Sequence, residues 1–214
     1  KLAKGIARST GLKNLCLAGG VALNCVANGK LLRENVFENI WIQPAAGDAG
    51  GAVGAALAAY YMMLGLPRKV DPALQDGMKG SYLGPEFAQD DIEKRLALVG
   101  AKFTVHSDQE IIELTAQALA SDKAVGWHQG RMEFGPRSLG GRSILADARS
   151  PSAQKLLNLK VKYRESFRPF APSVLREDVS EWFEIDTDSP YMLLVADVVK
   201  EVPIWSYKPF ITTD

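Results

Sequence analysis

The sequence predicts an α/β protein, and three observations along its 214 residues carry that prediction. Short apolar runs alternate with helical patterns in residues 1–66, Pro- and Gly-rich sequence follows in residues 67–87, and alternating patterns resume over residues 88–214. Strands that alternate with helices are typical of a buried sheet covered by helices. We therefore expect a first domain, a linker and a second domain over these three ranges, and an apolar content of 47% is sufficient for folded cores.

The first domain is predicted from two strand–turn–helix units. An amphipathic helix at 1–10 precedes the apolar runs NLCLAGG (14–20) and NIWIQP (39–44), which are typical of buried strands. A helical pattern follows each run, and the second pattern contains the most membrane-like stretch, residues 49–66. Its helical part is shorter than a bilayer core of about 30 Å, so we expect a buried helix of a soluble protein.

The linker and the second domain follow from turn residues and from renewed periodicity. Pro67, Pro72 and Pro85, mixed with glycines, interrupt every regular pattern. The patterns beyond them predict helices at 90–100, 108–122 and 152–162, and strands at 123–130, 143–148, 169–175 and 191–199. Asp108 is the expected cap of the second of these helices.

The charge and cysteine content limit which partners and which cellular compartment the sequence favours. The chain has 25 basic and 25 acidic residues, so no global field favours nucleic acid or an anionic membrane. Cys16 and Cys25 are too few for a disulfide framework and lack metal-finger spacing, which favours a reducing, cytoplasmic setting. The charge is nevertheless uneven, because ten Lys or Arg stand against three acids between Arg131 and Arg176.

Two basic segments contain most of that local excess. GRMEFGPRSLGGRS (130–143) places three arginines among glycines, and its apolar residues Met132, Phe134 and Leu139 should anchor it against a core. KVKYRESFRPFAPSVL (160–175) interleaves basic residues with aromatics. Guanidinium groups form planar forks that match phosphate and carboxylate oxygens, which favours an anion site over scattered surface ion pairs. Basic residues among aromatics also describe single-stranded nucleic-acid grooves, but such binders carry a net basic field that this chain lacks.

Two glycine-rich turns lie at the ends of the first two predicted strands. LAGGVALN (17–24) and GDAGGAVGAA (47–56) each lead into a helix, where backbone N–H groups and the helix dipole favour an anion. For the first pattern a tight turn without a ligand is the favoured explanation, because the conformational freedom of glycine is sufficient for it. Asp48 in the second turn is either a ligand of a hard metal ion or the N-cap of its own helix.

These four motifs, in their order along the chain, resemble those of the ATP-dependent O-carbamoyltransferases, the family of NodU-type nodulation enzymes and antibiotic-tailoring carbamoyltransferases. The resemblance implies that residues 1–66 end an actin- or sugar-kinase-like domain that binds metal and adenine nucleotide. It also implies that residues 88–214 form most of a YrdC-like α/β domain. Carbamoyl phosphate and ATP would give carbamoyl adenylate there, and the carbamoyl group would pass to a hydroxyl-bearing acceptor in the other domain.

The resemblance assigns roles to individual residues. The catalytic set is Arg137, Arg142 and Arg168; the substrate-binding set is Lys162, Arg164, Arg131 and Ser143; the nucleotide-binding set is Gly19, Gly20, Asn24, Gly47, Gly50 and Gly51; the metal ligand is Asp48. The implied cofactors are ATP and a divalent metal, iron or magnesium. We expect no nucleic-acid or membrane partner, and a homo-oligomer stays open.

Two departures and two alternatives accompany the resemblance. The family loop usually has alanine at Ser138 and asparagine at Gly141, which places the local polar contacts in doubt but not the arginines. The family's metal-binding histidine pair and its D-G-T-A-R segment lie outside this sequence, so we expect the chain to be inactive alone. The alternatives are another ATP-using phosphotransferase of the sugar-kinase fold and a single-stranded nucleic-acid-binding module.

Overall fold

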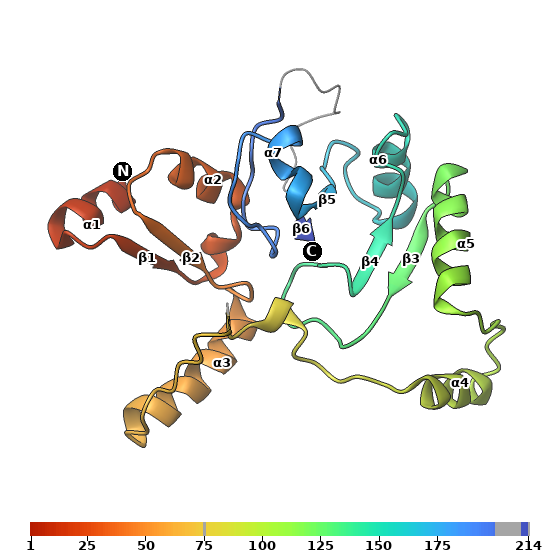
Figure 1. Ribbon diagram of the computed structural model, residues 1–214, viewed down its shortest axis with the longest axis horizontal. Helices are drawn as coiled ribbons and strands as arrows, with labels where there is room; N and C mark the ends of the chain where they lie inside the picture. Colours follow the sequence, from red (N-terminus) through yellow and green to blue (C-terminus); the bar gives the residue numbers. More distant parts are fainter. Residues whose placement is uncertain (75, 200–210, 214) are drawn as a thin grey trace. The chain divides into compact units, whose positions relative to one another are not determined.

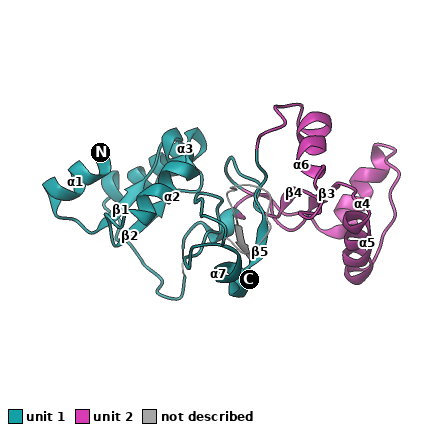
Figure 2. Cartoon of the chain, turned by 90° about the horizontal axis from the view of Figure 1, so that it is seen from above, with its two compact units in different colours: residues 1–81, 134–139, 169–214 teal, residues 82–133, 140–168 magenta. Residues whose placement is uncertain are grey.

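The computed structural model describes residues 1–74, 76–199 and 211–213. Helices and short strands alternate along the chain, so the α/β prediction is confirmed (Figure 1). The sugar-kinase-like and YrdC-like identities of the domains, and their boundaries, stay predictions. The chain forms two compact units (Figure 2): unit 1 is 1–81, 134–139 and 169–214, and unit 2 is 82–133 and 140–168.

Unit 1 begins with the two predicted strand–helix repeats. Helix α1 (Leu2–Thr10) leads to strand β1 (Asn14–Leu17), and helix α2 (Cys25–Arg33) leads to strand β2 (Asn39–Ile42). The two strands pair in parallel along their full lengths and lie side by side in Figure 1. Helix α1 ends at Gly11, whose φ of 66° is the left-handed conformation that glycine adopts without strain.

The glycine-rich helix α3 (Asp48–Ala58) is present, but the expectation that it is buried is wrong. It continues as a π-helical turn (Ala59–Met63), and none of the residues in either piece is buried. Met62 and Met63 are 82% and 83% exposed, because no element among the described residues covers this side of the helix. No helix in the described part of the chain is long and apolar enough to cross a membrane.

The core of unit 1 joins segments that are far apart in the sequence. Strand β5 (Ser173–Leu175) pairs in parallel with strand β6 (Ile211–Thr213), and helix α7 (Val179–Trp182) follows β5. The predicted strand at 191–199 is wrong, because its described residues form only isolated bridges. The main core cluster consists of Ala22, Ile42, Ala45, Ala46, Met78, Tyr191 and Leu193. Burial of apolar side chains therefore fixes this segment without a strand ladder.

Unit 2 contains the predicted elements of residues 89–161. They are α4 (Gln89–Leu98), α5 (Asp108–Ala120), β3 (Val125–His128), β4 (Arg142–Leu145) and α6 (Ala153–Leu156), followed by a π-helical turn (Leu157–Val161). Strands β3 and β4 pair antiparallel, and α5 lies beside β3 (Figure 1).

The start of helix α5 corrects one sequence prediction. Ser107, and not Asp108, is the N-cap, and it forms a capping box with Glu110. The Ser107 hydroxyl accepts from the Glu110 amide while the Glu110 carboxylate accepts from the Ser107 amide. This reciprocal arrangement satisfies two amides that the helix leaves unpaired. Asp108 then occupies the first helical position, where its charge favours the helix dipole.

Candidate functional site

The two glycine-rich turns of unit 1 meet at one edge of the β1–β2 pair. Parallel strands bring their carboxyl ends to the same edge, so the turns that follow them become neighbours. The Gly19 amide donates to the Ala46 carbonyl at 2.8 Å, and Gly19 has a φ of 93°. The side chain of Asn24 caps α2 by accepting from the Ala27 amide at 3.1 Å. The nucleotide-binding roles of these residues stay predictions.

Asp48 is the first residue of α3, and the N-cap is Gly47, which makes no side-chain capping bond. Its carboxylate is exposed and has no hydrogen bond or ion pair within the described residues. No group of three His, Cys, Asp or Glu side chains in that part of the chain could hold a metal ion. The N-cap alternative is therefore wrong, and Asp48 offers at most one ligand to a metal.

The other glycines of this turn differ in their surroundings. A Cβ added to Gly50 would lie 1.9 Å from the Ala45 carbonyl oxygen, so the start of α3 packs on the turn too closely for any side chain. Positions 20, 47 and 51 face open space. Their backbone can be approached by a ligand, whereas Gly50 is required for packing.

Arg137 is bound to the first glycine-rich turn. Its Nη2 donates to the Leu23 carbonyl at 2.9 Å, and both residues belong to unit 1. Phe134 and Leu139 pack against the unit 1 core, and the Phe134 amide donates to the Ser81 carbonyl at 2.7 Å. The predicted anchoring is thus confirmed for these two side chains, whereas Met132 is 43% exposed and does not anchor the segment.

Arg142 is bound to a buried carboxylate. Its Nε donates to Glu133 Oε2 at 3.0 Å, and the Gly141 amide donates to Oε1 of the same side chain at 2.7 Å. The Glu133 side chain is fully buried, whereas that of Arg142 is 40% exposed. Burial, aided by the Glu133 charge, raises the pKa of Tyr82. Within unit 2 the two oxygens of the Glu133 carboxylate are therefore occupied by different donors, Oε2 by Arg142 and Oε1 by the Gly141 amide.

Gly141 is sterically required in that site. A Cβ at this position would lie 2.7 Å from the Tyr82 ring and 3.2 Å from the Glu133 carboxylate. An asparagine at this position, which the resemblance leads us to expect, would displace these groups. Glycine therefore fits the way this chain packs Tyr82 and Glu133.

Arg131 and Ser143 have local partners in unit 2. Arg131 donates from Nε to the Gly84 carbonyl at 3.1 Å and lies 3.6 Å from the Glu86 carboxylate, in an exposed ion pair. The Ser143 hydroxyl accepts from the Gly140 amide at 3.1 Å. Both contacts shape the backbone of the first basic segment, residues 130–143. The roles of Arg131 and Ser143 in substrate binding stay predictions.

The second basic segment is organised by a residue that the sequence did not single out. The Asn158 side chain is fully buried, and its Oδ1 accepts from Arg164 Nε at 2.6 Å. Its Nδ2 donates to the carbonyl oxygens of Ser166 at 3.2 Å and Arg168 at 2.7 Å. Gln154, one turn earlier, donates to the Phe167 carbonyl at 3.2 Å and to that of Arg168 at 3.1 Å.

Lys162 and Arg168 lie at the surface of this segment. The Arg168 Nε forms a 2.7 Å ion pair with Glu165, and both side chains are about half exposed. Lys162 is also exposed, and its amide donates to the Leu157 carbonyl at 2.9 Å across the π-helical turn. An exposed pair such as Arg168–Glu165 is weak, so a ligand could replace the carboxylate at little cost.

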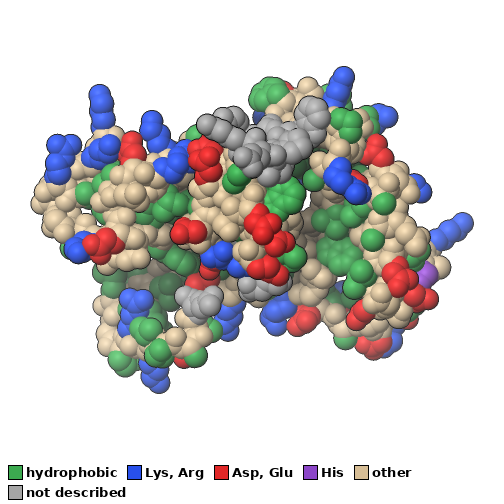
Figure 3. Space-filling view, turned by 45° about the horizontal axis from the view of Figure 1, so that its top comes forward, with side chains coloured by type: hydrophobic (Ala, Val, Ile, Leu, Met, Phe, Trp, Pro, Cys, Tyr) green, Lys and Arg blue, Asp and Glu red, His purple; other side chains and the backbone are tan. Residues whose placement is uncertain are grey.

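The predicted site residues are divided between the two units. Arg137 and the glycine-rich turns belong to unit 1, whereas Arg131, Arg142 and residues 162–168 belong to unit 2. Their convergence on one pocket stays a prediction. On the face shown in Figure 3, basic side chains are interspersed with acidic ones, and no single-sign surface appears there.

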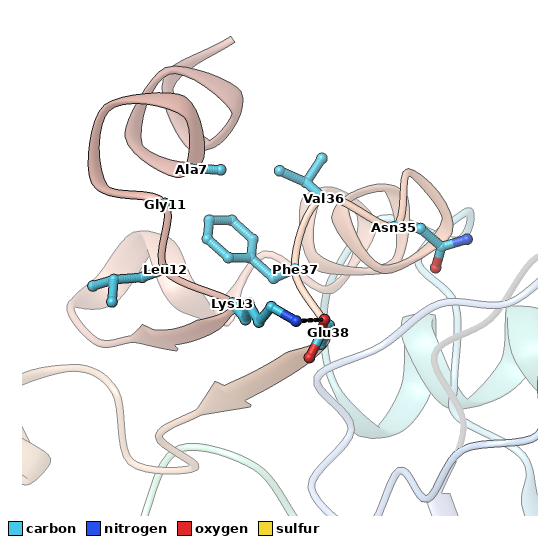
Figure 4. Close-up of a pocket in the computed structure, with 8 residues that line it drawn as sticks. All are labelled: Ala7, Gly11, Leu12, Lys13, Asn35, Val36, Phe37 and Glu38. Atoms are coloured by element: carbon cyan, nitrogen blue, oxygen red, sulfur yellow. Dashed lines mark hydrogen bonds and ion pairs between the residues drawn. The ribbon is translucent and has the colours of Figure 1, made fainter.

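An open pocket of about 490 Å³ in unit 1 contains none of the predicted site residues. It lies between the end of α1 and residues 35–38, where Phe37 points toward Ala7 (Figure 4). Lys13 and Glu38 form an ion pair of 2.5 Å on its wall. Since this pair is exposed, it gives the pocket little preference for a charged ligand.

Sequence comparisons identify the family to which these motifs belong. Residues 2–57 match the family model described as carbamoyltransferase N-terminus, and residues 116–206 match the one described as carbamoyltransferase C-terminus. The chain belongs to the carbamoyltransferase family. The resemblance predicted from the four motifs is thereby confirmed.

Several relatives of this carbamoyltransferase chain are longer than it is. An uncharacterized protein of Synechocystis sp. is 57% identical over 204 residues, which are 94% of this chain and 33% of that protein. The nodulation protein NolNO of Sinorhizobium fredii is 44% identical over 88% of this chain and 28% of its own length. NolO of Bradyrhizobium diazoefficiens is 44% identical over 89% of this chain and 34% of its own. The carbamoyltransferase chain thus spans about a third of these relatives.

Proposed function

We propose that the full-length protein is an ATP-dependent O-carbamoyltransferase. Carbamoyl phosphate is hydrolysed to carbamate and orthophosphate, the carbamate oxygen displaces pyrophosphate from ATP to give carbamoyl adenylate, and a hydroxyl-bearing acceptor then takes the carbamoyl group with release of AMP. The observation that carries this proposal is that Arg137, Arg142 and Arg164 each have their guanidinium group bound to a protein oxygen, in a chain of this family.

Fixed guanidinium groups suit this reaction because both substrates are polyanions. Bringing carbamoyl phosphate to ATP works against the repulsion of their phosphates, and cations held in advance reduce that repulsion. An arginine that is already hydrogen-bonded has lost part of its side-chain freedom before the substrate arrives. Positioning and charge stabilisation then supply the catalysis, with no nucleophile from the protein.

The basic residues divide this work by their surroundings. Arg142 and Arg164 are held rigidly and would define the position of the phosphates. Lys162 and Arg168 are exposed and would close on them as mobile cations, with Arg168 exchanging Glu165 for a substrate oxygen. Arg137 would place a further charge beside the glycine-rich turn at Leu23.

The turns of unit 1 support a nucleotide more readily than a metal. The open backbone at positions 20, 47 and 51 permits close approach of phosphate oxygens at the start of a helix. Asp48 has no second metal ligand beside it among the described residues. A divalent metal at Asp48 would need its other ligands from outside the described residues.

Pyrophosphate release by the full-length protein tests the proposal, since an adenylate forms from ATP with loss of pyrophosphate. We expect release to require both ATP and carbamoyl phosphate. Phosphorylation of an alcohol by ATP without carbamoyl phosphate would favour the sugar-kinase-type alternative. Oligonucleotide binding that falls steeply with salt, without pyrophosphate release, would favour the nucleic-acid alternative.

A further inference from the structure

We infer that Asn158 is a positioning residue that sets the orientation of Arg164 and the course of residues 164–168 for binding the anionic carbamoyl donor, an inference that rests on the proposed function. The sequence places Asn158 inside a helical pattern, where it resembles an ordinary polar residue. Its complete burial and its three side-chain hydrogen bonds set it apart from such a residue.

Every side-chain hydrogen bond of Asn158 goes to the basic segment. One partner is a guanidinium nitrogen and two are carbonyls in residues 164–168. The Asn158 carbonyl also accepts from the Arg164 amide at 2.9 Å. Gln154 adds two bonds to the same stretch. A buried asparagine that only satisfied its own helix would bond to helix carbonyls, so these contacts serve the segment and not the helix.

The local backbone is adapted to these contacts. The helix changes to a π-helical turn at Leu157–Val161, and Tyr163 follows with a φ of 49°, a conformation that non-glycine residues rarely adopt. Both features carry a conformational cost, and π turns are frequent at functional sites. They return the chain over Asn158, so that its carboxamide meets residues that are six to ten positions later.

The chemistry of this contact requires a carboxamide. Oδ1 accepts from a cation while Nδ2 donates to two carbonyls, and no other group of this length combines one acceptor with two donors. A carboxylate would repel both carbonyls and would neutralise Arg164. The carboxamide instead fixes the plane of the guanidinium group without adding a negative charge beside it.

The test compares Asn158→Ala with Leu157→Ala in the full-length protein. Leu157 is also buried, so its truncation lowers stability, but its side chain makes no hydrogen bond to the basic segment. We expect Asn158→Ala to raise the Kd and KM for carbamoyl phosphate about tenfold or more, and Leu157→Ala to change them less than about twofold. Combining Asn158→Ala with Arg164→Gln should add little to the loss caused by Arg164→Gln alone.

Equal losses in the two alanine variants, or no loss in Asn158→Ala, would overturn the inference. A wild-type protein that neither binds nor consumes carbamoyl phosphate would instead refute the proposed function. Hydrogen exchange without substrate then still decides the role of Asn158. Faster exchange of the amides at 164–168 in Asn158→Ala than in Leu157→Ala supports positioning, and equal exchange overturns it.

Discussion

Arg142 is held by a carboxylate, whereas Arg164 is held by a carboxamide. The two arginines look alike in the sequence, and each donates its Nε to a buried side-chain oxygen at 3.0 or 2.6 Å. Glu133 partly offsets the charge of Arg142, whereas the neutral Asn158 carboxamide adds no negative charge beside Arg164. Two equally ordered guanidinium groups should therefore differ in how strongly they attract a phosphate.

Because of this difference, the two arginines should contribute differently to folding stability and to ligand binding. Glu133 is fully buried and cannot lose Arg142 without leaving a charge in the protein interior, so this pair is tied to folding. Asn158 is neutral, so removing Arg164 leaves no Asn158 charge in the protein interior. Arg142 should matter more for the stability of unit 2, and Arg164 more for ligand affinity.

Replacing each arginine with glutamine gives the largest expected effects. Arg164→Gln should weaken carbamoyl phosphate binding by about 10- to 150-fold, the value of one hydrogen bond to a charged group. Arg142→Gln should weaken it less than about tenfold but lower the free energy of unfolding by about 3 kcal/mol. Calorimetric titration and urea unfolding of the full-length protein measure the two quantities. A larger loss of affinity in Arg142→Gln than in Arg164→Gln would contradict this difference between the two arginines.

Exchanging the carboxylate at 133 for a carboxamide, and the carboxamide at 158 for a carboxylate, should reverse the difference in charge between the two arginine sites. We expect smaller effects than for the arginine variants. Glu133→Gln removes the charge beside Arg142 and should tighten carbamoyl phosphate binding by about threefold to fivefold. Asn158→Asp adds a charge beside Arg164 and should weaken binding by at least as much. Affinities measured at low and high salt separate this charge effect from misfolding, because only the charge effect is screened. If both variants changed the affinity in the same direction, the proposed charge effect would be contradicted.

Arg137 extends the comparison to a third kind of acceptor, the Leu23 backbone carbonyl. A neutral carbonyl adds no negative charge beside Arg137, as Asn158 adds none beside Arg164. Arg137→Lys keeps the charge but loses the planar fork, so we expect binding to weaken by about threefold to tenfold. Arg8→Lys is the matched control, since exposed Arg8 also donates to a carbonyl, that of Lys4 at 3.2 Å. If Arg137→Lys and Arg8→Lys change the affinity for carbamoyl phosphate equally, Arg137 is not part of the binding site.

The sequence revealed the local elements of this fold but not the acceptors that distinguish the arginines. Apolar periodicity predicted β1, β2 and α5, because these elements depend on neighbouring residues. Asn158 could not be recognised, because its role depends on a backbone that turns back over the helix. Glu133 was noted only as one of three acids in a basic region, and only the fold pairs it with Arg142.

Two errors in the sequence analysis have the same origin. Residues 191–199 have the composition of a strand, but their apolar side chains enter the core of unit 1 without a ladder. The apolar helix α3 was expected to be buried, yet none of its residues is. Composition reports that a segment favours burial, and it does not report which partner covers it.

The smallest expected effect is a change in the pKa of Tyr82, which reports on the charge of Glu133. Burial, followed by the Glu133 charge, raises the pKa of the Tyr82 phenol above its ordinary value near 10. Glu133→Gln should remove the second cause and lower the pKa of Tyr82, while burial keeps it elevated. Ultraviolet titration isolates this phenol among six tyrosines when the Tyr82→Phe variant is subtracted.

The raised pKa of Tyr82 also has a predictable sign in stability. The folded protein holds the phenolic proton more tightly than the unfolded chain does, so this contribution is complete below pH 10 and is lost as the pH rises through the folded pKa. Glu133→Gln should shift that loss to lower pH, and Tyr82→Phe should abolish it. An unchanged Tyr82 titration in Glu133→Gln would contradict this prediction, because it would mean that the Glu133 charge does not act on the phenol.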